Sequence, residues 1–335
     1  MRWDALSLDG QEPGLFGTPV TVDTPEFRGI TFHEIRAKSI INKVPGASRV
    51  PFAWTINPYR GCSHACRYCF ARNTHTYLDF DAGHDFDSQI VVKVNAPELV
   101  RRELAAPKWA GEHIAMGTNV DCYQRAEGRY RLMPGIIEAL RDAANPFSIL
   151  TKGSLILRDL PLLEEAAERT EVGTAVSVGS VDKELWRLVE PGTPSPHKRL
   201  EVCATLGEHG IACGVLMGPI VPYLSDTPRQ LEAAVRGIAE AGATSVSAIV
   251  LHLRPGAREW FMSWLRECHP ELVAPYERLY GRGAYAPKDY QRRISAKVAE
   301  LAAEYGVGRG GRPLRAPAPA PKVPPAPVAE QLPLL

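Results

Sequence analysis

From about residue 51 onward, short apolar runs alternate with longer segments of helical periodicity. The runs are rich in β-branched residues and nearly free of charge, which is typical of buried strands. They read VPFAWTI, EHIAMGTN, FSILT, GTAVSV, IACGVLMGP and TSVSAIVLHL. The segments between them space their apolar residues three and four apart, which predicts amphipathic helices. These read APELVRREL, LMPGIIEALRDA, RDLPLLEEAAER, DKELWRLVE, HKRLEVCATLGEHG and PRQLEAAVRGIAEAG. Gly210 and Gly242 follow two of them, as helix stop signals do.

This alternation repeats about six times and therefore predicts a parallel sheet. Six units suit an open or partial barrel better than a closed eight-stranded one, so we expect an α/β fold with a partial (β/α)6 TIM-type barrel. In such folds the chemistry lies at the carboxyl ends of the strands. Residues 1–50 show little periodicity, so we expect an irregular N-terminal extension there. We expect the barrel core in residues 51–255, a C-terminal helical appendage in residues 256–308 and a disordered linker in residues 309–335.

The composition is that of an ordinary globular chain, with 335 residues, 45% hydrophobic and 23% charged. The net charge of +1 neither favours nor excludes nucleic acid as a partner. The N-terminus lacks the pattern of a secretory signal, and no uncharged run is long enough to span a membrane. Seven cysteines in such a chain predict thiols that are free or metal-bound in a reducing compartment. We therefore expect a cytoplasmic protein that does not enter a membrane.

Three of the cysteines, Cys62, Cys66 and Cys69, are crowded into the stretch NPYRGCSHACRYCFAR. Thiolates are soft ligands that select zinc or iron–sulfur clusters. A four-iron cluster is usually held by four cysteines, so three local thiolates leave one iron open to another ligand. The alternative is a zinc site completed by a distant cysteine, by His64 or by His75. On the spacing alone, both kinds of site stay open.

The spacing C-x3-C-x2-C, with the aromatic Tyr68 before the last cysteine, resembles the signature of radical S-adenosylmethionine (SAM) enzymes. The wider string NPYRGCSHACRYCFAR is similar to the spore-photoproduct-lyase-like branch of that superfamily. The resemblance covers roughly residues 28 to 290. It extends to GTNVDCYQRAEGRYRL, TKGSLILRDLPLL, LVEPGTPSPHKRLE and GVLMGPIVPYLSD.

This resemblance implies a specific cofactor set. Cys62, Cys66 and Cys69 would ligate three irons of a [4Fe–4S] cluster, and SAM would chelate the fourth iron. One electron, from a donor such as flavodoxin or ferredoxin, would cleave SAM to a 5′-deoxyadenosyl radical. In such an enzyme the cofactor carries out the organic chemistry, while the protein positions it, excludes water and sets the electrostatic environment.

The resemblance also implies roles at the ends of the predicted strands. Asp121, with backbone groups of Gly117 and Thr118, would bind the amino group of SAM. Cys122 and Tyr123 would relay the radical, although buried thiols at strand ends are also common as packing.

Further along the chain, the hydroxyls of Ser177 and Ser180 would bond the ribose or act as caps. Arg199 would pair with the SAM carboxylate, or with Glu190 as an ion pair between two helices. Gly214 and Gly218 would lie beside the adenine, but Val221 stands where an acid is sometimes found in the family. The remaining cysteines, Cys203, Cys213 and Cys268, lie on apolar faces and predict core thiols.

Two further features suggest partners. Residues 28–72 hold eight Lys or Arg residues against one acid, Glu34, which suits phosphate contacts with DNA or offsets an anionic cofactor. The tail has seven prolines between residues 312 and 328, so we expect a stiff linker. It ends in QLPLL, Gln331 to Leu335, which resembles the peptide that binds the bacterial sliding clamp. The sequence thus predicts a radical SAM enzyme, with DNA repair or nucleic-acid modification as its setting. The alternatives are a zinc-stapled adaptor and a radical SAM enzyme for a protein or small molecule.

Overall fold

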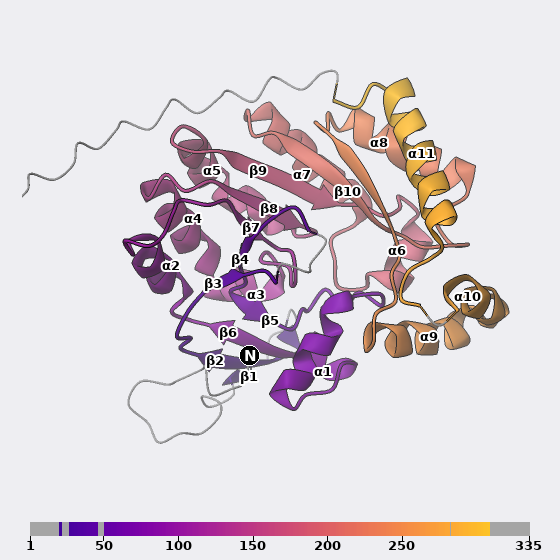
Figure 1. The fold of residues 1–335 in the computed structure, drawn as a ribbon, viewed down its shortest axis with the longest axis horizontal. Coiled ribbons are helices and arrows are strands. Elements are labelled where there is room, and N and C mark those ends of the chain that lie inside the picture. Colours follow the sequence, from indigo (N-terminus) through magenta and orange to yellow (C-terminus); the bar gives the residue numbers. More distant parts are fainter. Residues whose placement is uncertain (1–19, 22–26, 46–49, 282, 309–335) are drawn as a thin grey trace, which may run out of the picture.

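A computed structural model describes residues 20–21, 27–45, 50–281 and 283–308 of the chain. The predicted linker and the QLPLL peptide lie outside these residues. Figure 1 shows one body in which helices surround a sheet that runs through the molecule. The strands are β1 (Val20–Thr21), β2 (Thr31–Ile35), β3 (Ile41–Lys43), β4 (Trp54–Ile56), β5 (Tyr59–Arg60), β6 (Gln89–Lys93), β7 (Ile114–Met116), β8 (Phe147–Thr151), β9 (Val172–Ser177), β10 (Cys213–Ile220) and β11 (Val246–Val250).

The helices lie mostly between these strands and follow the predicted segments closely. They are η3 (Phe70–Leu78), α1 (His84–Ser88), α2 (Ala96–Leu104), α3 (Arg125–Tyr130), α4 (Leu132–Asp142), η4 (Ser154–Asp159), α5 (Leu160–Ala167), α6 (Lys183–Val189), α7 (Pro196–Glu208), α8 (Pro228–Glu240), α9 (Ala257–Cys268), η5 (Pro270–Leu272), α10 (Val273–Tyr280) and α11 (Lys288–Glu304).

The main sheet has the order β11-β10-β9-β8-β7-β4-β3. Each of the six predicted runs supplies one strand, and neighbours from β4 to β11 pair in parallel. The prediction of an α/β fold with a parallel sheet is therefore confirmed. β3 closes one edge by pairing antiparallel to β4.

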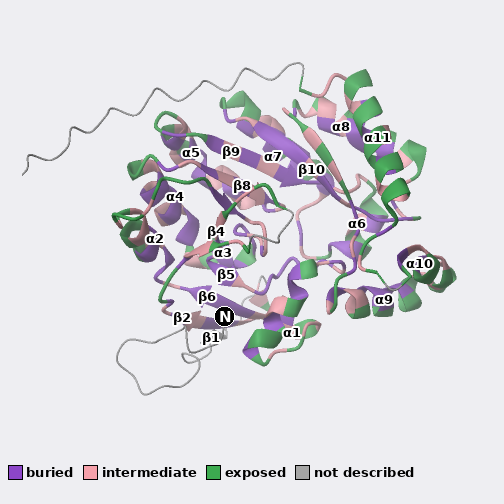
Figure 2. Cartoon of the chain, in the orientation of Figure 1, coloured by how far each residue is buried: buried purple, intermediate pink, exposed green. Residues whose placement is uncertain are grey.

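The helices cover the sheet with apolar faces. α7 packs against β9 and β10, and α11 packs against β11 and α8. Local sequence sets their ends: in α8, Thr227 accepts a bond from the Gln230 amide while Pro228 occupies the first turn. Gly210 and Gly242 end α7 and α8 at φ +78° and +68°, as predicted. Figure 2 shows the result, with buried strands and helices exposed on their outer sides.

The prediction of an irregular N-terminal extension is wrong for part of its range. β3 belongs to the main sheet, and β2 belongs to a second sheet of order β1-β2-β6-β5. β2 pairs in parallel with β6, a strand that the periodicity did not reveal. β5 also separates the cysteine loop from β4, so the loop does not follow the first strand of the main sheet directly. No helix of the described residues is long and apolar enough to cross a membrane.

Candidate functional site

The three cysteines lie in a loop built from two consecutive tight turns. The amide of Ala65 bonds to the carbonyl of Cys62 at 3.1 Å, and the amide of Cys69 bonds to that of Cys66 at 3.3 Å. Each turn therefore begins with a cysteine. Gly61 enters the loop at φ +75°, a conformation that favours glycine.

Neighbouring segments fix this loop from two sides. The buried amide group of Gln124 donates to the carbonyl of Gly61 at 2.9 Å and accepts from the amide of Ser63 at 2.9 Å. On the other side, the amide of Arg67 bonds to the carbonyl of Val189, and the amide of Gly192 bonds to that of His64. The main chain of the cysteine loop is thus held by one side chain and by backbone contacts, none of which involves a metal.

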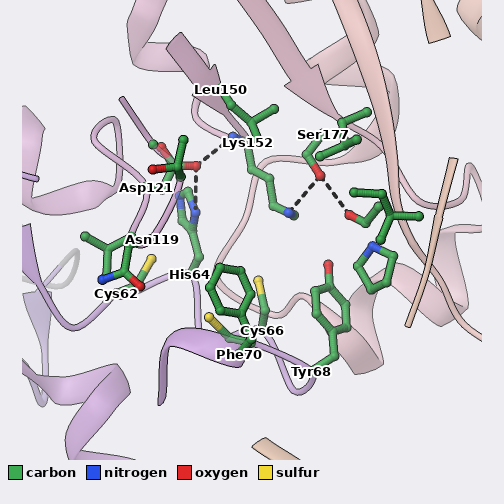
Figure 3. A pocket seen from close by; sticks show the side chains of 18 of the residues that line it. Cys62, His64, Cys66, Tyr68, Phe70, Asn119, Asp121, Leu150, Lys152 and Ser177 are labelled. Carbon is green, nitrogen blue, oxygen red and sulfur yellow. Dashed lines mark hydrogen bonds and ion pairs between the residues drawn. The ribbon is translucent and has the colours of Figure 1, made fainter. Parts of the chain in front are cut away.

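The loop forms one wall of a pocket at the carboxyl ends of the strands, where the chemistry was expected. The pocket encloses about 870 Å³ free of protein atoms, part of it open to solvent. Nine predicted residues line it, namely Cys62, Cys66, Tyr68, Cys69, Gly117, Thr118, Asp121, Ser177 and Gly218. Figure 3 shows the loop opposite the strand ends.

The chemistry of the donor set fits an iron–sulfur cluster. Burial raises the pKa of all three thiols, that of Cys66 to about 12, and neighbouring thiols add to the rise at Cys62 and Cys66. Thiolates that repel one another in a buried site are stabilised when they bind cationic iron. No three His, Cys, Asp or Glu side chains within the described ranges converge on one metal ion. A cluster differs from a single ion in that each thiolate binds its own iron.

The two histidines considered as zinc ligands take other partners. His64 lines the pocket, and its Nδ1 lies 3.3 Å from Oδ2 of Asp121. His75 is fully buried, and its Nε2 lies 2.9 Å from the carbonyl oxygen of Gln89.

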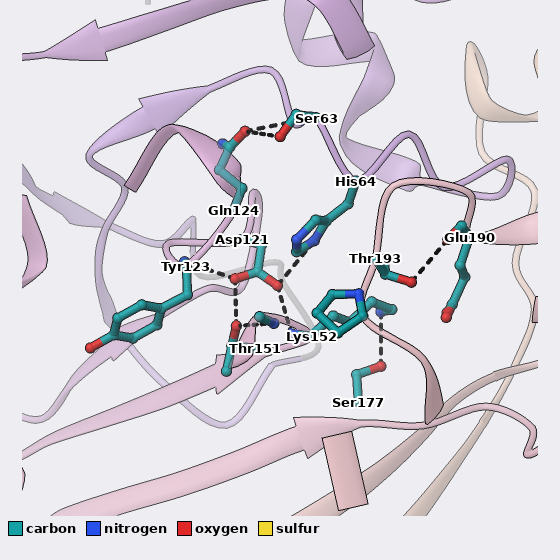
Figure 4. A network of polar contacts seen from close by, with 12 residues as sticks. Ser63, His64, Asp121, Tyr123, Gln124, Thr151, Lys152, Ser177, Glu190 and Thr193 are labelled. Atoms are coloured by element: carbon teal, nitrogen blue, oxygen red, sulfur yellow. Dashed lines mark hydrogen bonds and ion pairs between the residues drawn. The ribbon is translucent and has the colours of Figure 1, made fainter. Parts of the chain in front are cut away.

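Asp121 is the centre of a polar network in the pocket wall. Its Oδ1 accepts from the amide of Tyr123 at 2.9 Å and from the hydroxyl of Thr151 at 2.6 Å. Its Oδ2 accepts from the amide of Lys152 at 2.6 Å (Figure 4). Burial alone would raise the pKa of Asp121, but His64 and these hydrogen bonds lower it to about 2. The carboxylate predicted to bind SAM is therefore already engaged on both oxygens.

Glu190 and Arg199 form an ion pair beneath the cysteine loop rather than lining the pocket. Arg199 is 1% exposed, and it donates to Glu190 and to the carbonyl of Ser177. The other oxygen of Glu190 accepts from the hydroxyl of Tyr68. Burial alone would raise the pKa of Glu190, but Arg199 and Lys152 hold it below its usual range. Of the two predicted roles of Arg199, this geometry matches the ion pair.

Lys152 is a side chain of the pocket wall that the sequence analysis missed. It follows β8 directly, and it is the one Lys or Arg among the described pocket-lining residues. Its ammonium group donates to the hydroxyl of Ser177 at 2.8 Å and lies 5.8 Å from the centre of the Tyr68 ring. Ser177 in turn donates to the carbonyl of Gly218. The sequence signal for Lys152 is a single lysine at the end of an apolar strand, because an ammonium group that is partly removed from water needs a polar partner.

Cys122 and Tyr123 lie away from the pocket. Cys122 is 0% exposed and Tyr123 is 1% exposed, and neither lines the pocket wall. The hydroxyl of Tyr123 points to Asp159 at 3.0 Å. The geometry does not support the predicted radical relay, because Asp121 faces the pocket while the next two side chains turn into the core.

Other predicted residues also take structural positions. Ser180 bonds to the amide of Asp182 just before α6, and Gly214 lies within β10. Cys203 and Cys213 are buried as predicted. The prediction for Cys268 is wrong, since this last residue of α9 is exposed while Trp264 and Leu265 supply the buried face.

Two arginines of the basic stretch from Arg28 to Arg72 take acidic partners. Arg72 is 0% exposed, pairs with Asp87 at 2.9 Å and lies over the ring of Trp260. Arg36 pairs with Glu98 at 3.1 Å. Arg72 thus makes an internal contact beside the cysteine loop, where it also donates to the carbonyl of Cys66 at 3.0 Å, whereas the pair of Arg36 lies at the surface.

Comparison with known proteins defines the family. The sequence profile of the Radical SAM superfamily matches residues 56–246, which include the cysteine loop and the strands that carry the pocket. The chain therefore belongs to the radical SAM superfamily and is an enzyme. It is 51% identical to an "Uncharacterized protein" of Mycobacterium bovis, over 93% of this chain and 95% of the relative. It is 34% identical to one of Methanocaldococcus jannaschii, over 58% and 69% of the two chains.

Solved structures of spore photoproduct lyase share the fold. The enzyme complexed with dinucleoside spore photoproduct aligns with a TM-score of 0.62 over 83% of this chain and 80% of that one. A mutant of it with bound AdoMet and dinucleoside spore photoproduct aligns with a TM-score of 0.63, over 89% and 86% of the two chains. The identity is 15% in both cases, so the likeness shows the fold alone.

Proposed function

We propose that Cys62, Cys66 and Cys69 hold a [4Fe–4S] cluster and that SAM binds beside it in the pocket at the strand ends. The observation that carries this proposal is that one pocket is lined both by the three thiols and by residues at the carboxyl ends of β7, β8 and β9. When bound, these cofactors supply a 5′-deoxyadenosyl radical, formed by one-electron cleavage of SAM. The proposed frame is a partial (β/α)6 barrel, in which such a pocket lies at the carboxyl ends of the strands.

Lys152 is the residue we assign to the carboxylate of SAM. Its ammonium group already lies at the pocket wall, within 2.8 Å of Ser177. Arg199 is excluded from this role because its guanidinium is committed to Glu190 and to main-chain carbonyls. Asp121 then acts through its neighbours, because it fixes the amide of Lys152 and the ring of His64.

The other pocket residues position and shield the ligand. Gly117, Thr118 and Ser177 offer main-chain groups and hydroxyls for the amino group and ribose, and Gly218 allows close approach of the adenine. Leu150, Leu216, Ile249 and Leu251 give the pocket an apolar side, which excludes water from a reactive radical. The proposal routes no step through Cys122 or Tyr123.

DNA lesion repair or nucleic-acid modification is the setting we propose. Two observations support it: the fold shared with spore photoproduct lyase and the clamp-like peptide Gln331 to Leu335. A donor such as flavodoxin or ferredoxin would supply the electron, and the bacterial sliding clamp would be a partner in the cytoplasm. Deleting residues 331–335 should abolish binding to purified clamp. Unchanged binding would remove the clamp from the proposal, and the alternative of a radical SAM enzyme that acts on a protein or small molecule would remain.

The cofactor assignment is tested by comparing two cysteine variants after anaerobic reconstitution. Cys62→Ala should lose most of the bound iron and all formation of 5′-deoxyadenosine. Cys203→Ala is the matched control, because that thiol is also buried but lies on α7 against β10, outside the pocket. SAM cleavage retained in Cys62→Ala would contradict the assignment. Tightly bound zinc without sulfide in the wild type would instead favour the adaptor.

A further inference from the structure

Three aromatic rings lead from the pocket to the surface. Phe70 and His252 both line the pocket, and their ring centres lie 5.5 Å apart. The His252 ring lies 5.5 Å from that of Tyr285, which is outside the pocket lining. Together with Arg254, these residues form what we call the aromatic rim.

The rim is open to solvent although it is made of large rings. Phe70 is 37% exposed and Tyr285 is 45% exposed, while Arg254 is exposed as well. Exposed aromatic faces at the mouth of a site are available to stack on a planar group of a ligand. Since Phe70 is also part of the pocket wall, such a ligand would reach the bound cofactors.

The rim is held in place by main-chain contacts. The amide of Leu253 bonds to the carbonyl of Ala284 at 2.7 Å, beside a β-bridge between His252 and Tyr285. Arg258 donates to the carbonyls of Gly281 and Gly283 at 2.8 and 2.9 Å. The segments that carry His252 and Tyr285 are thus fixed to one another before any ligand binds, which lowers the cost of ordering the site.

The charge of the rim is positive. The guanidinium of Arg254 lies 5.6 Å from the centre of the Phe70 ring and 6.0 Å from that of the Tyr285 ring. It donates to the hydroxyl of Tyr285 at 2.9 Å, and in the described part of the chain it forms no ion pair. A cation over two exposed rings suits a ligand that carries both a planar ring and a nearby anion.

We propose that the aromatic rim binds one unpaired base of a single-stranded or locally opened nucleic acid, with the base on the Phe70 and Tyr285 rings and an adjacent phosphate on Arg254. A nucleotide joins a planar ring and an anion in one unit, whereas an aromatic side chain of a protein carries no such charge. This inference rests on the proposed function, because it names what that site would hold next to SAM.

The test uses the reconstituted full chain and a single-stranded oligonucleotide that contains 2-aminopurine, whose fluorescence falls on stacking. Tyr285→Ala should weaken binding about 5- to 150-fold, the range expected for one lost base–aromatic stack. Tyr285→Phe keeps the ring and should bind within about threefold of wild type. Arg254→Gln should reduce the slope of log affinity against log salt by about 0.7, the value for one phosphate contact on a single strand.

Tyr77→Ala is the matched control, because Tyr77 is 61% exposed on the same helix as Phe70 but lies outside the rim and the pocket lining. It should bind as the wild type does. Equal affinity of Tyr285→Ala and wild type would overturn the inference. A second result would also overturn it: the wild type does not bind the oligonucleotide but binds a tryptophan-containing peptide, and Tyr285→Ala loses that peptide binding.

Iron content and 5′-deoxyadenosine formation, measured on the same preparations without oligonucleotide, separate two kinds of failure. If the wild type cleaves SAM but does not bind the oligonucleotide, only the proposed role of the aromatic rim is contradicted. A wild type that holds no cluster contradicts the proposed function, and then the inference that rests on it fails too.

Discussion

Asp121→Asn should destabilise the chain even when no cofactor is bound. The substitution keeps the shape of the side chain but replaces one acceptor oxygen with an NH2 group. If that group takes the position of Oδ2, it faces the amide of Lys152, which now bonds to Asp121 at 2.6 Å. The Asp121 side chain is 10% exposed, so water cannot readily replace the lost acceptor.

The magnitude follows from these contacts. One buried donor without a partner costs about 1–3 kcal/mol. Exchanging charge-assisted bonds for neutral ones at Tyr123 and Thr151 adds roughly 1 kcal/mol. The same contacts lower the pKa of Asp121 to about 2, against about 3.9 for a free aspartate, and this difference corresponds to about 2.6 kcal/mol in favour of the carboxylate. We therefore expect a loss of about 2–4 kcal/mol.

Urea unfolding of the cluster-free protein, followed by circular dichroism, measures this loss. The control is Asp182→Asn, because Asp182 caps α6 through its side chain and asparagine caps a helix equally well. That control should stay within about 0.5 kcal/mol of wild type. If Asp121→Asn were no less stable than the control, the reasoning that the network organises this site would be refuted.

Three further outcomes follow from buried groups. Arg199→Met leaves Glu190 buried without its cationic partner, so we expect urea unfolding to show a loss of about 3–5 kcal/mol of stability. The double variant Glu190→Gln/Arg199→Met should recover part of that loss, and no recovery would argue against the ion pair. Burial lowers the pKa of Lys93 to about 7, whereas an unfolded lysine titrates near about 10.4. The unfolded chain then binds more protons between these values, so stability should rise with pH across this window, and Lys93→Met should remove its share of that rise. An unchanged pH slope would contradict the lowered pKa of the buried Lys93. Gln124→Leu removes the side-chain clamp on the cysteine loop, so bound iron should be lost to a chelator faster than in wild type, and an equal rate would show that the backbone contacts suffice.

The parallel sheet could be predicted because its strands carry their own signal. Runs such as FSILT and GTAVSV are apolar, β-branched and separated by amphipathic segments, and each became a strand of the main sheet. The second sheet could not be predicted in this way. β2 and β6 are five residues each and pair across more than fifty residues, so only tertiary contact reveals them.

The candidate site, like the fold, is in part predictable from local sequence and in part set by tertiary contacts. The cysteine loop could be predicted because its spacing is visible in a short stretch of sequence. Nine of the predicted site residues do line one pocket. The direction of individual side chains is not local information, as Asp121 and Cys122 show by facing opposite ways. The partners of Lys152 and Arg199 lie on other strands and helices, so their roles depend on packing that periodicity does not encode.

The most direct test of the central claim is electron paramagnetic resonance on anaerobically reconstituted, dithionite-reduced protein, with and without SAM. The account predicts a reduced [4Fe–4S] signal whose shape changes when SAM is added, because the three thiolates leave one iron open to the cofactor. A sample that holds zinc and gives no iron–sulfur signal, or a cluster signal that SAM leaves unchanged, would contradict it.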